Sequence, residues 1–233
     1  MLTREFRRVV CVHEAGHAVI CALGGAPIHG LAVAPEGSES WTYPTRKGGV
    51  LQGLWGACEP SDCPWISIYL NWDSTQLCYQ ANRNEFDSLH RSTAVSLGPT
   101  RGRKFLADVR RFLRQRICGL LAGPIAESYF EQREFNVWDE EGWTDPSSDV
   151  EKAMGLAQLL PYRSEFEHAC DVTSEALRRP EIWMRVIALA DELERTGNLC
   201  SDAIDKFLPK PDLEWPPSAA SRWRGHPTME LVQ

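Results

Sequence analysis

The spacing of apolar side chains predicts a helix at the start of the chain, followed by a small sheet. Apolar residues recur every three or four positions over residues 3–24, which is the period of an α-helix, and a glycine pair and a proline end the pattern. The apolar run at residues 28–34 favours a short strand, and a second strand is expected at residues 50–51. The sequence therefore places a helix beside a small sheet.

The helical period is lost over residues 52–104, which are rich in tryptophan, tyrosine and turn-forming residues. We interpret this stretch as an insertion with irregular structure and one or two short helices. The period returns at residues 105–131, where Gly119 and Gly123 indicate close packing against another helix or a local kink. After a polar loop, further helices are predicted at 149–160, 164–178, 180–195 and 200–208.

These elements define a single, mainly α-helical domain over residues 1–208, with a small β-sheet beside the first helix. Residues 209–233 are rich in proline, tryptophan and arginine, and we expect them to form a mobile tail. The sequence contains no internal repeat.

Composition narrows the class of protein. Hydrophobic residues make up 43% and charged residues 24% of the 233 residues, which is ordinary for a soluble globular protein. The formal net charge is −7, whereas binding to nucleic acid needs clustered lysine and arginine, so we expect no nucleic-acid partner. The one basic run, at residues 101–104 with the arginines that follow it, is interpreted as a solvated helix face.

The chain lacks the sequence signals of export and of membrane insertion. It contains no run of about 18 uncharged apolar residues, so we expect no membrane span. Its first residues are charged and do not resemble a signal peptide. We therefore expect a cytoplasmic protein whose eight cysteines are free thiols.

Residues 13–17 read His-Glu-Ala-Gly-His and form an H-E-x-x-H motif on the first predicted helix. His13 and His17 are four positions apart and lie on one face of that helix, so both imidazoles can bind one metal ion. Glu14 projects beside the ion, where it can take a proton from zinc-bound water and pass it to a leaving amine. Chance placement of core histidines is the alternative, but unpaired polar groups in an apolar stretch would cost several kcal/mol. The motif therefore predicts a zinc site with Glu14 as catalytic base.

A catalytic zinc site needs a third protein ligand and an open fourth position for water. Spacing along the chain does not identify this third ligand. By residue type alone, the eligible side chains are those of His29, His90, Glu127, Asp145, Asp149 and His168.

The wider string at residues 13–20, His-Glu-Ala-Gly-His-Ala-Val-Ile, resembles the peptidase domain of the FtsH-type AAA proteases, which are zinc metallopeptidases. Later segments resemble that family in the same order. They are Pro27-Ile-His-Gly-Leu-Ala-Val-Ala-Pro35, Gly48-Gly-Val50, Leu121-Ala-Gly-Pro-Ile-Ala-Glu127 and Thr144-Asp-Pro-Ser-Ser-Asp-Val-Glu-Lys-Ala153. The resemblance covers about residues 13–51 and 105–208, and leaves the insertion and the tail unmatched.

The resemblance implies that Asp149 is the third zinc ligand, because the aspartate of the family's last segment completes its metal site. From the residues alone, an ordinary N-cap or first-turn acid of a helix is the favoured interpretation of Asp149. Glu127 is the alternative ligand. The resemblance also implies that an extended substrate pairs with the strand near Val50.

The sequence departs from the family in ways that limit the expected function. It contains no G-x-x-x-x-G-K-[ST] phosphate loop, and Pro124 replaces the family's usual arginine. We therefore predict a zinc metalloendopeptidase without its own ATPase, acting on peptides or unfolded proteins. A separate AAA ATPase partner and a homo-oligomer both remain open. The alternatives are a zinc-binding regulatory module with little turnover and a metal-free relic.

Overall fold

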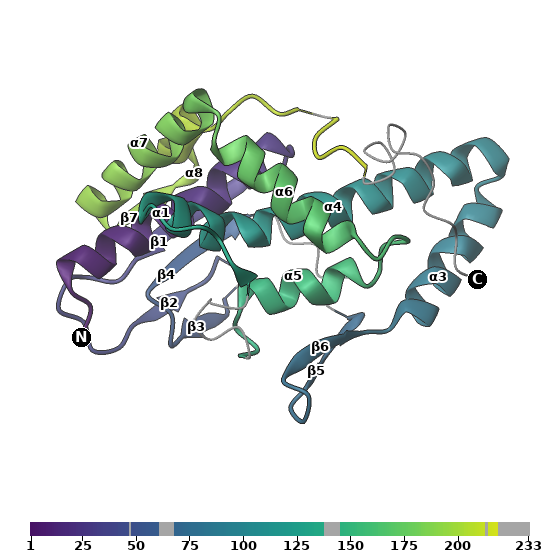
Figure 1. Cartoon of the computed structure of the whole chain (residues 1–233), viewed down its shortest axis with the longest axis horizontal. Coiled ribbons are helices and arrows are strands. Elements are labelled where there is room, and N and C mark those ends of the chain that lie inside the picture. The colour runs from purple at the N-terminus through teal and green to yellow at the C-terminus, as the bar shows by residue number, and fades with distance from the viewer. Residues whose placement is uncertain (47, 61–67, 138–144, 213, 219–233) are drawn as a thin grey trace.

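The computed structural model describes residues 1–46, 48–60, 68–137, 145–212 and 214–218 of the chain. Within this part helices predominate, and the short strands form small sheets (Figure 1). The predicted mainly α-helical fold with a minor β component is therefore confirmed.

Two helices, α1 (Arg4–Leu23) and α4 (Pro99–Phe130), form the centre of the fold. The second half of α1 is fully buried because its residues are almost all apolar or small. The two backbones approach closely where Gly16 faces α4, since a Cβ atom there would lie 2.7 Å from the Ala122 carbonyl oxygen. The prediction that glycines mark a close helix contact is confirmed, and the partner helix is α1.

Helix α4 begins at Pro99, six residues before the start that the apolar pattern predicts. Proline is favourable in the first turn of a helix, where its missing N–H has no intrahelical partner. The first turns carry exposed basic side chains at positions 101, 103 and 104 and few apolar ones, so they show no helical period. The prediction of a solvated basic helix face is therefore confirmed for these first turns, and it is wrong for Arg114, which is buried.

The sheet beside α1 has three antiparallel strands in the order β4-β1-β7. The central strand β1 (Ile28–Val33) pairs with β4 (Gly56–Pro60) on one side and with β7 (Asn198–Cys200) on the other. Strands β2 (Thr42–Pro44) and β3 (Val50–Gln52) form a separate two-stranded sheet.

The prediction for residues 52–104 is confirmed in its expectation of one or two short helices and wrong in its expectation of otherwise irregular structure, since the described residues also form strands. The stretch contributes β4 to the main sheet, a hairpin of β5 (Leu70–Asp73) and β6 (Cys78–Ala81), and helix α3 (Arg83–Ser96). The strands are four or five residues long and only partly buried, so they lack the alternation by which longer strands are recognised. Residues 61–67 of this stretch lie outside the described residues.

The C-terminal part is helical and packs on α1 and α4. A buried ion pair joins α4 to α6, with the Arg114 guanidinium donating two hydrogen bonds of 2.7 Å to the Glu165 carboxylate. The elements are α5 (Asp149–Ala157), α6 (Glu165–Leu177), α7 (Pro180–Thr196), α8 (Ser201–Ile204) and the 3₁₀ turn η2 (Asp205–Phe207).

The described part of the segment expected to form a mobile tail is packed against the domain. Trp215 is buried, and its carbonyl oxygen accepts a hydrogen bond of 3.1 Å from the Gln115 side chain. The Asp212 N–H donates to the Leu23 carbonyl oxygen at 2.8 Å. Residues 213 and 219–233, on which the rest of that expectation falls, lie outside the described residues.

Two expectations about the chain as a whole can be compared with the described residues. None of their helices combines the length and the apolar character that crossing a membrane requires. Their seven cysteines are all free thiols.

Candidate metal centre

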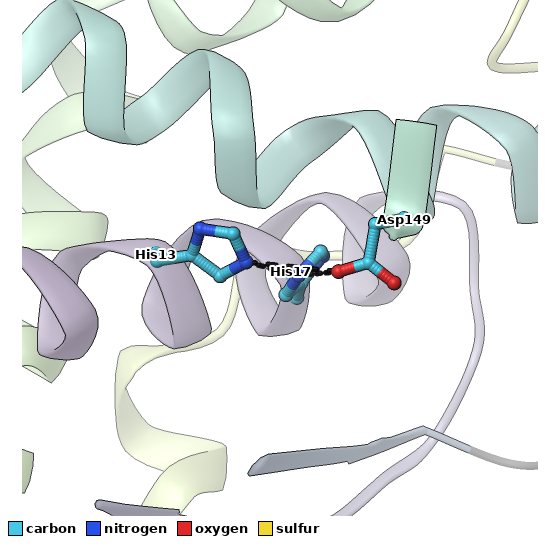
Figure 2. A group of neighbouring side chains, drawn as sticks. All are labelled: His13, His17 and Asp149. Atoms are coloured by element: carbon cyan, nitrogen blue, oxygen red, sulfur yellow. Dashed lines mark hydrogen bonds and ion pairs between the residues drawn. The ribbon is translucent and has the colours of Figure 1, made fainter. Parts of the chain in front are cut away.

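Three side chains from two helices converge at the crossing of α1 and α4 (Figure 2). His13 and His17 project from successive turns of α1. Asp149 is the first residue of α5, and the Ser148 hydroxyl before it caps this helix by accepting a hydrogen bond from the Glu151 N–H. The cap fixes the start of α5, so the Asp149 carboxylate is directed at the two imidazoles.

The distances among the three ligand atoms fit a metal ion. The Nε2 atoms of His13 and His17 are 3.0 Å apart, and Asp149 Oδ2 lies 3.0 Å from the His17 Nε2 and 3.6 Å from the His13 Nε2. Ligand atoms of a tetrahedral zinc ion, with bonds of about 2.0–2.1 Å, are separated by about 3.3 Å. Two imidazoles and a carboxylate are also donors that zinc accepts.

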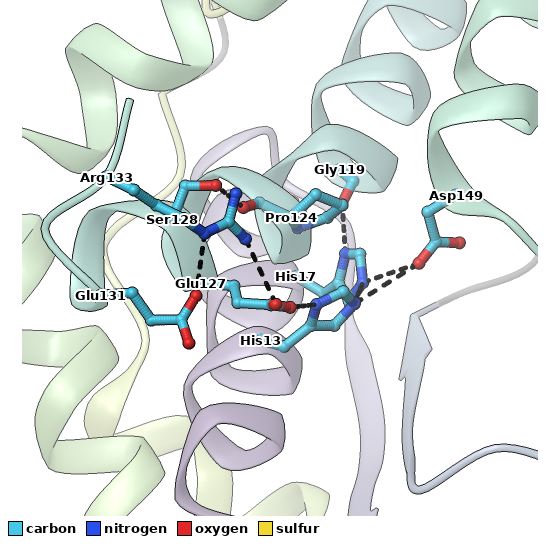
Figure 3. Close-up of polar contacts among 9 residues, drawn as sticks. All are labelled: His13, His17, Gly119, Pro124, Glu127, Ser128, Glu131, Arg133 and Asp149. Atoms are coloured by element: carbon cyan, nitrogen blue, oxygen red, sulfur yellow. Dashed lines mark hydrogen bonds and ion pairs between the residues drawn. The ribbon is translucent and has the colours of Figure 1, made fainter. Parts of the chain in front are cut away.

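Hydrogen bonds on the far side of each imidazole orient the rings (Figure 3). The His17 Nδ1 lies 2.6 Å from the Gly119 carbonyl oxygen, and the His13 Nδ1 lies 3.1 Å from Glu127 Oε2. Both partners are acceptors, so each Nδ1 carries a proton and donates it. Each neutral ring then presents a bare Nε2 lone pair, and two such lone pairs and a carboxylate oxygen face one another. This arrangement needs a shared proton or a cation between them.

The backbone of α4 leaves room for an ion at this point. A Cβ atom at Gly123 would lie 2.4 Å from the His17 Nε2 and 2.5 Å from the His13 Nε2. A side chain there would therefore fill the space in front of both ligand nitrogens. Because residue 123 has no side chain, α4 can pack directly over the two histidines.

The charges of the metal-free site are strongly coupled. Burial alone would lower the pKa of His13, but hydrogen bonds to Asp149 and Glu127 raise it to about 10. Burial works against ionisation of Asp149, but the two histidines hold its pKa well below the usual value. The Lys152 amine, 3.5 Å from the other carboxylate oxygen, supports the same ionised state. A metal ion binds deprotonated imidazoles, so its binding here would release a proton from His13.

Glu14 lies next to the three candidate ligands on the side of strand β4. Only 8% of the residue is exposed, and burial raises the pKa of its carboxyl group, although the two histidines oppose this. Gly56 of β4 passes directly against it, since a Cβ atom there would lie 2.5 Å from Glu14 Oε1. The carboxylate is thus held between α1 and β4, beside the ligand atoms rather than among them.

A cleft of about 1,020 Å³ gives access to these groups. Residues of α1, α4, β4 and the start of α5 line it, and they include both histidines, Glu14 and Asp149. Apolar side chains, among them those of Leu54, Trp55 and Leu120, line the cleft next to the charged ones. The arrangement combines a possible metal position, a buried carboxylate and an accessible volume large enough for a short peptide segment.

The other side chains that were eligible as third ligand lie elsewhere or have other roles. Glu127 binds the far nitrogen of His13 and not the ligand group itself. His90 is buried among the rings of Tyr69, Phe86 and Phe105. The remaining three have partners outside the centre. The His29 ring contacts the Arg46 guanidinium, and the Asp145 carboxylate accepts a hydrogen bond from the Ser147 hydroxyl. The His168 ring contacts the Pro217 carbonyl oxygen.

Sequence reasoning missed three backbone contributions to this centre. Gly119 supplies the carbonyl oxygen that orients His17, while Gly123 and Gly56 leave the space around the ligands and Glu14. The pattern at 119–123 indicated close packing but could not show that metal ligands face it.

Comparisons with known proteins add no identification. No family model matches the chain, and no curated protein matches its sequence. The resemblance to the FtsH-type peptidase domain therefore stays a prediction, and the function has to be argued from the centre.

Proposed function

We propose that this protein is a zinc-dependent metallopeptidase, and that His13, His17 and Asp149 are its metal ligands. The observation that carries the proposal is the convergence of three ligand atoms beside a buried carboxylate, at the wall of one cleft. When bound by these residues, zinc would polarise the scissile carbonyl and make hydroxide available at neutral pH.

Glu14 would serve as general base and then as general acid. Its carboxylate would accept the proton of the attacking water and deliver it to the amine that leaves. The confinement of Glu14 between α1 and Gly56 supports this role, because a base has to be held at a fixed distance from the reacting atoms. Its raised pKa brings the carboxyl group closer to neutral pH, as proton transfer in both directions requires.

Strand β4 is the strand that we favour for receiving substrate, and the strand expected near Val50 also reaches the cleft, through Leu51 of β3. Val50 lies in β3, which pairs with β2 in the separate two-stranded sheet. Strand β4 lies against Glu14, lines the cleft, and among the described strands pairs only with β1. Its second edge would bind an extended peptide by main-chain hydrogen bonds, which suits peptides and unfolded proteins. Folded substrates would then need a separate unfoldase, such as an AAA ATPase.

Cleavage of casein and of short quenched-fluorescence peptides by zinc-loaded protein tests this proposal. We expect wild-type cleavage to be lost on treatment with a chelator and restored by zinc. Glu14→Gln should bind zinc as wild type does but lose at least about 10²-fold in turnover, because a positioned general base typically contributes that much. Glu134→Gln, an exposed acid at the cleft, is the matched control and should retain activity.

The same experiment separates the alternatives. Wild-type protein that binds zinc but cleaves no substrate would identify a binding or regulatory module. Wild-type protein that binds no zinc would identify a relic, and equal cleavage by Glu14→Gln and wild type would refute the role of Glu14.

A further inference from the structure

Arg116 of α4 lines the cleft without a charged partner. The residue is partly buried, and it forms no ion pair or hydrogen bond with any residue that the structure describes. The arginine two positions earlier differs, since Arg114 is held by two hydrogen bonds to Glu165. Acidic residues outnumber basic ones by 32 to 25 in this chain, so partners for an arginine are plentiful. Within the described residues, Arg116 is therefore a partly buried cation that lines the cleft and has no acidic partner.

The position of Arg116 relative to the metal ligands follows from the helix crossing. Arg116 precedes Gly123 by two turns on the same face of α4, which is about 10 Å along the helix. Cys21 lies one turn after His17 on α1, and a Cβ atom at Gly119 would be 2.5 Å from its sulfur atom. Helix α4 therefore runs antiparallel to α1, and Arg116 lies at the end of the cleft next to Cys21.

Among the residues that the structure describes, no anionic side chain pairs with Arg116 at this end of the cleft. Its neighbours are thiols: burial raises the pKa of Cys21 to about 11, and the charge of Arg116 is the main influence in the opposite direction. Burial also raises the pKa of Cys58 of β4, well above its usual value. With their pKa values raised, both thiols stay uncharged at neutral pH and offer Arg116 no negative charge.

The opposite end of the cleft is acidic. Glu127, Glu131 and Glu134 line it, and Arg133 is already paired with the first two of them. The charge along the cleft therefore changes sign from one side of the metal ligands to the other. A substrate bound across the centre would meet a cation on one side and an excess of carboxylates on the other.

We propose that Arg116 binds a carboxylate of the substrate, a few residues to one side of the bond that is cleaved. The position of this carboxylate relative to the cleaved bond rests on the proposed peptidase function. A guanidinium matches a carboxylate through two parallel hydrogen bonds, and a separation of about 10 Å corresponds to about three extended residues. Two sources offer this chemistry, namely an aspartate or glutamate side chain and the C-terminal carboxylate of a peptide.

Binding of fluorescently labelled eight-residue peptides to Glu14→Gln protein, measured by anisotropy, tests the proposal without turnover. A single glutamate is moved through an otherwise uncharged, C-terminally amidated sequence, and the glutamine counterpart is the reference. A further peptide carries glutamine and a free C-terminal carboxylate, so that the two sources are distinguished. The variants are Arg116→Gln, Arg116→Lys and, as matched control, Arg103→Gln, an exposed arginine on the same helix.

At least one carboxylate position should bind about tenfold or more tightly than its uncharged counterpart, as a charge-assisted hydrogen bond provides. Arg116→Gln should abolish this preference, Arg116→Lys should retain part of it, and Arg103→Gln should leave it unchanged. The absence of any preference, or a preference that survives Arg116→Gln, overturns the proposal.

Zinc content and wild-type turnover, measured separately, decide the proposed peptidase function. All binding measurements are therefore made on both zinc-loaded and metal-free protein. A preference that depends on Arg116 in protein that takes up no zinc would overturn the peptidase but leave the carboxylate site intact.

Discussion

Replacement of Gly123 by alanine offers the sharpest test of the metal centre. The added Cβ atom would lie 2.4 Å from the His17 Nε2, 2.5 Å from the His13 Nε2 and 2.6 Å from the His13 Cδ2. Non-bonded carbon contacts are normally about 3.5 Å or longer, so the imidazoles would have to move by about 1 Å. Retreat of α4 instead would separate its backbone at Ala122 from Gly16 and open the close packing of the two central helices.

A shift of about 1 Å exceeds the tolerance of about 0.2 Å for zinc–ligand distances. Loss of an outer hydrogen-bond partner alone typically weakens metal binding by about 10–100-fold, so displacement of the ligands themselves should cost more than about 100-fold. The metal-free protein should be affected far less. Overpacking costs about 1–3 kcal/mol, and alanine recovers about 0.5–1 kcal/mol of helix propensity.

Competition with a chromophoric chelator measures the zinc dissociation constant, and thermal unfolding of metal-free protein measures the stability. Gly24→Ala is the matched control, because its nearest contact is the flexible Gln115 side chain at 3.1 Å, and it should bind zinc as wild type does. Zinc affinity within a factor of three of wild type in Gly123→Ala would refute the inference that α4 closes over the ligand atoms.

The other predictions concern the ligands, their support and the core. In chelator competition, Asp149→Ala should lose zinc at concentrations that saturate wild type. Glu127→Gln should keep zinc with an affinity lowered about 10–100-fold. The reverse ranking of the two variants would make Glu127 the ligand. Saturating zinc should raise the unfolding temperature of wild type but not of Asp149→Ala, since only a folded ligand set gains from binding; equal shifts in both proteins would contradict the assigned site. Arg114→Ala should lower the free energy of unfolding by about 3–5 kcal/mol in urea titrations, because it leaves the fully buried Glu165 carboxylate unpaired. Zinc affinity should not change. A loss of stability below about 1 kcal/mol would contradict a stabilising role of this ion pair.

The helices and the histidine motif were predictable because their signals are local. Apolar periodicity locates α1 to within a residue at each end, and the four-residue spacing of His13 and His17 places both on one face. The third carboxylate was not predictable from spacing, because Asp149 reaches the histidines through the packing of α5 on α4, and only the resemblance singled it out. Strand β4 was missed for a similar reason, since Gly56 and its neighbours become a strand through pairing with β1.

The three candidate ligands come from two helices, α1 and α5, so metal binding and the docking of α5 stabilise each other. The free energy by which Asp149 strengthens metal binding equals the free energy by which a bound ion stabilises the docking of α5. Helix α5 in turn holds the β5–β6 hairpin, because the Gln158 side-chain amide of its C-cap donates to the Tyr79 carbonyl oxygen at 3.0 Å and accepts from the Ala81 N–H at 3.1 Å. Loading of the centre would therefore slow amide hydrogen exchange in a hairpin that touches none of the ligands.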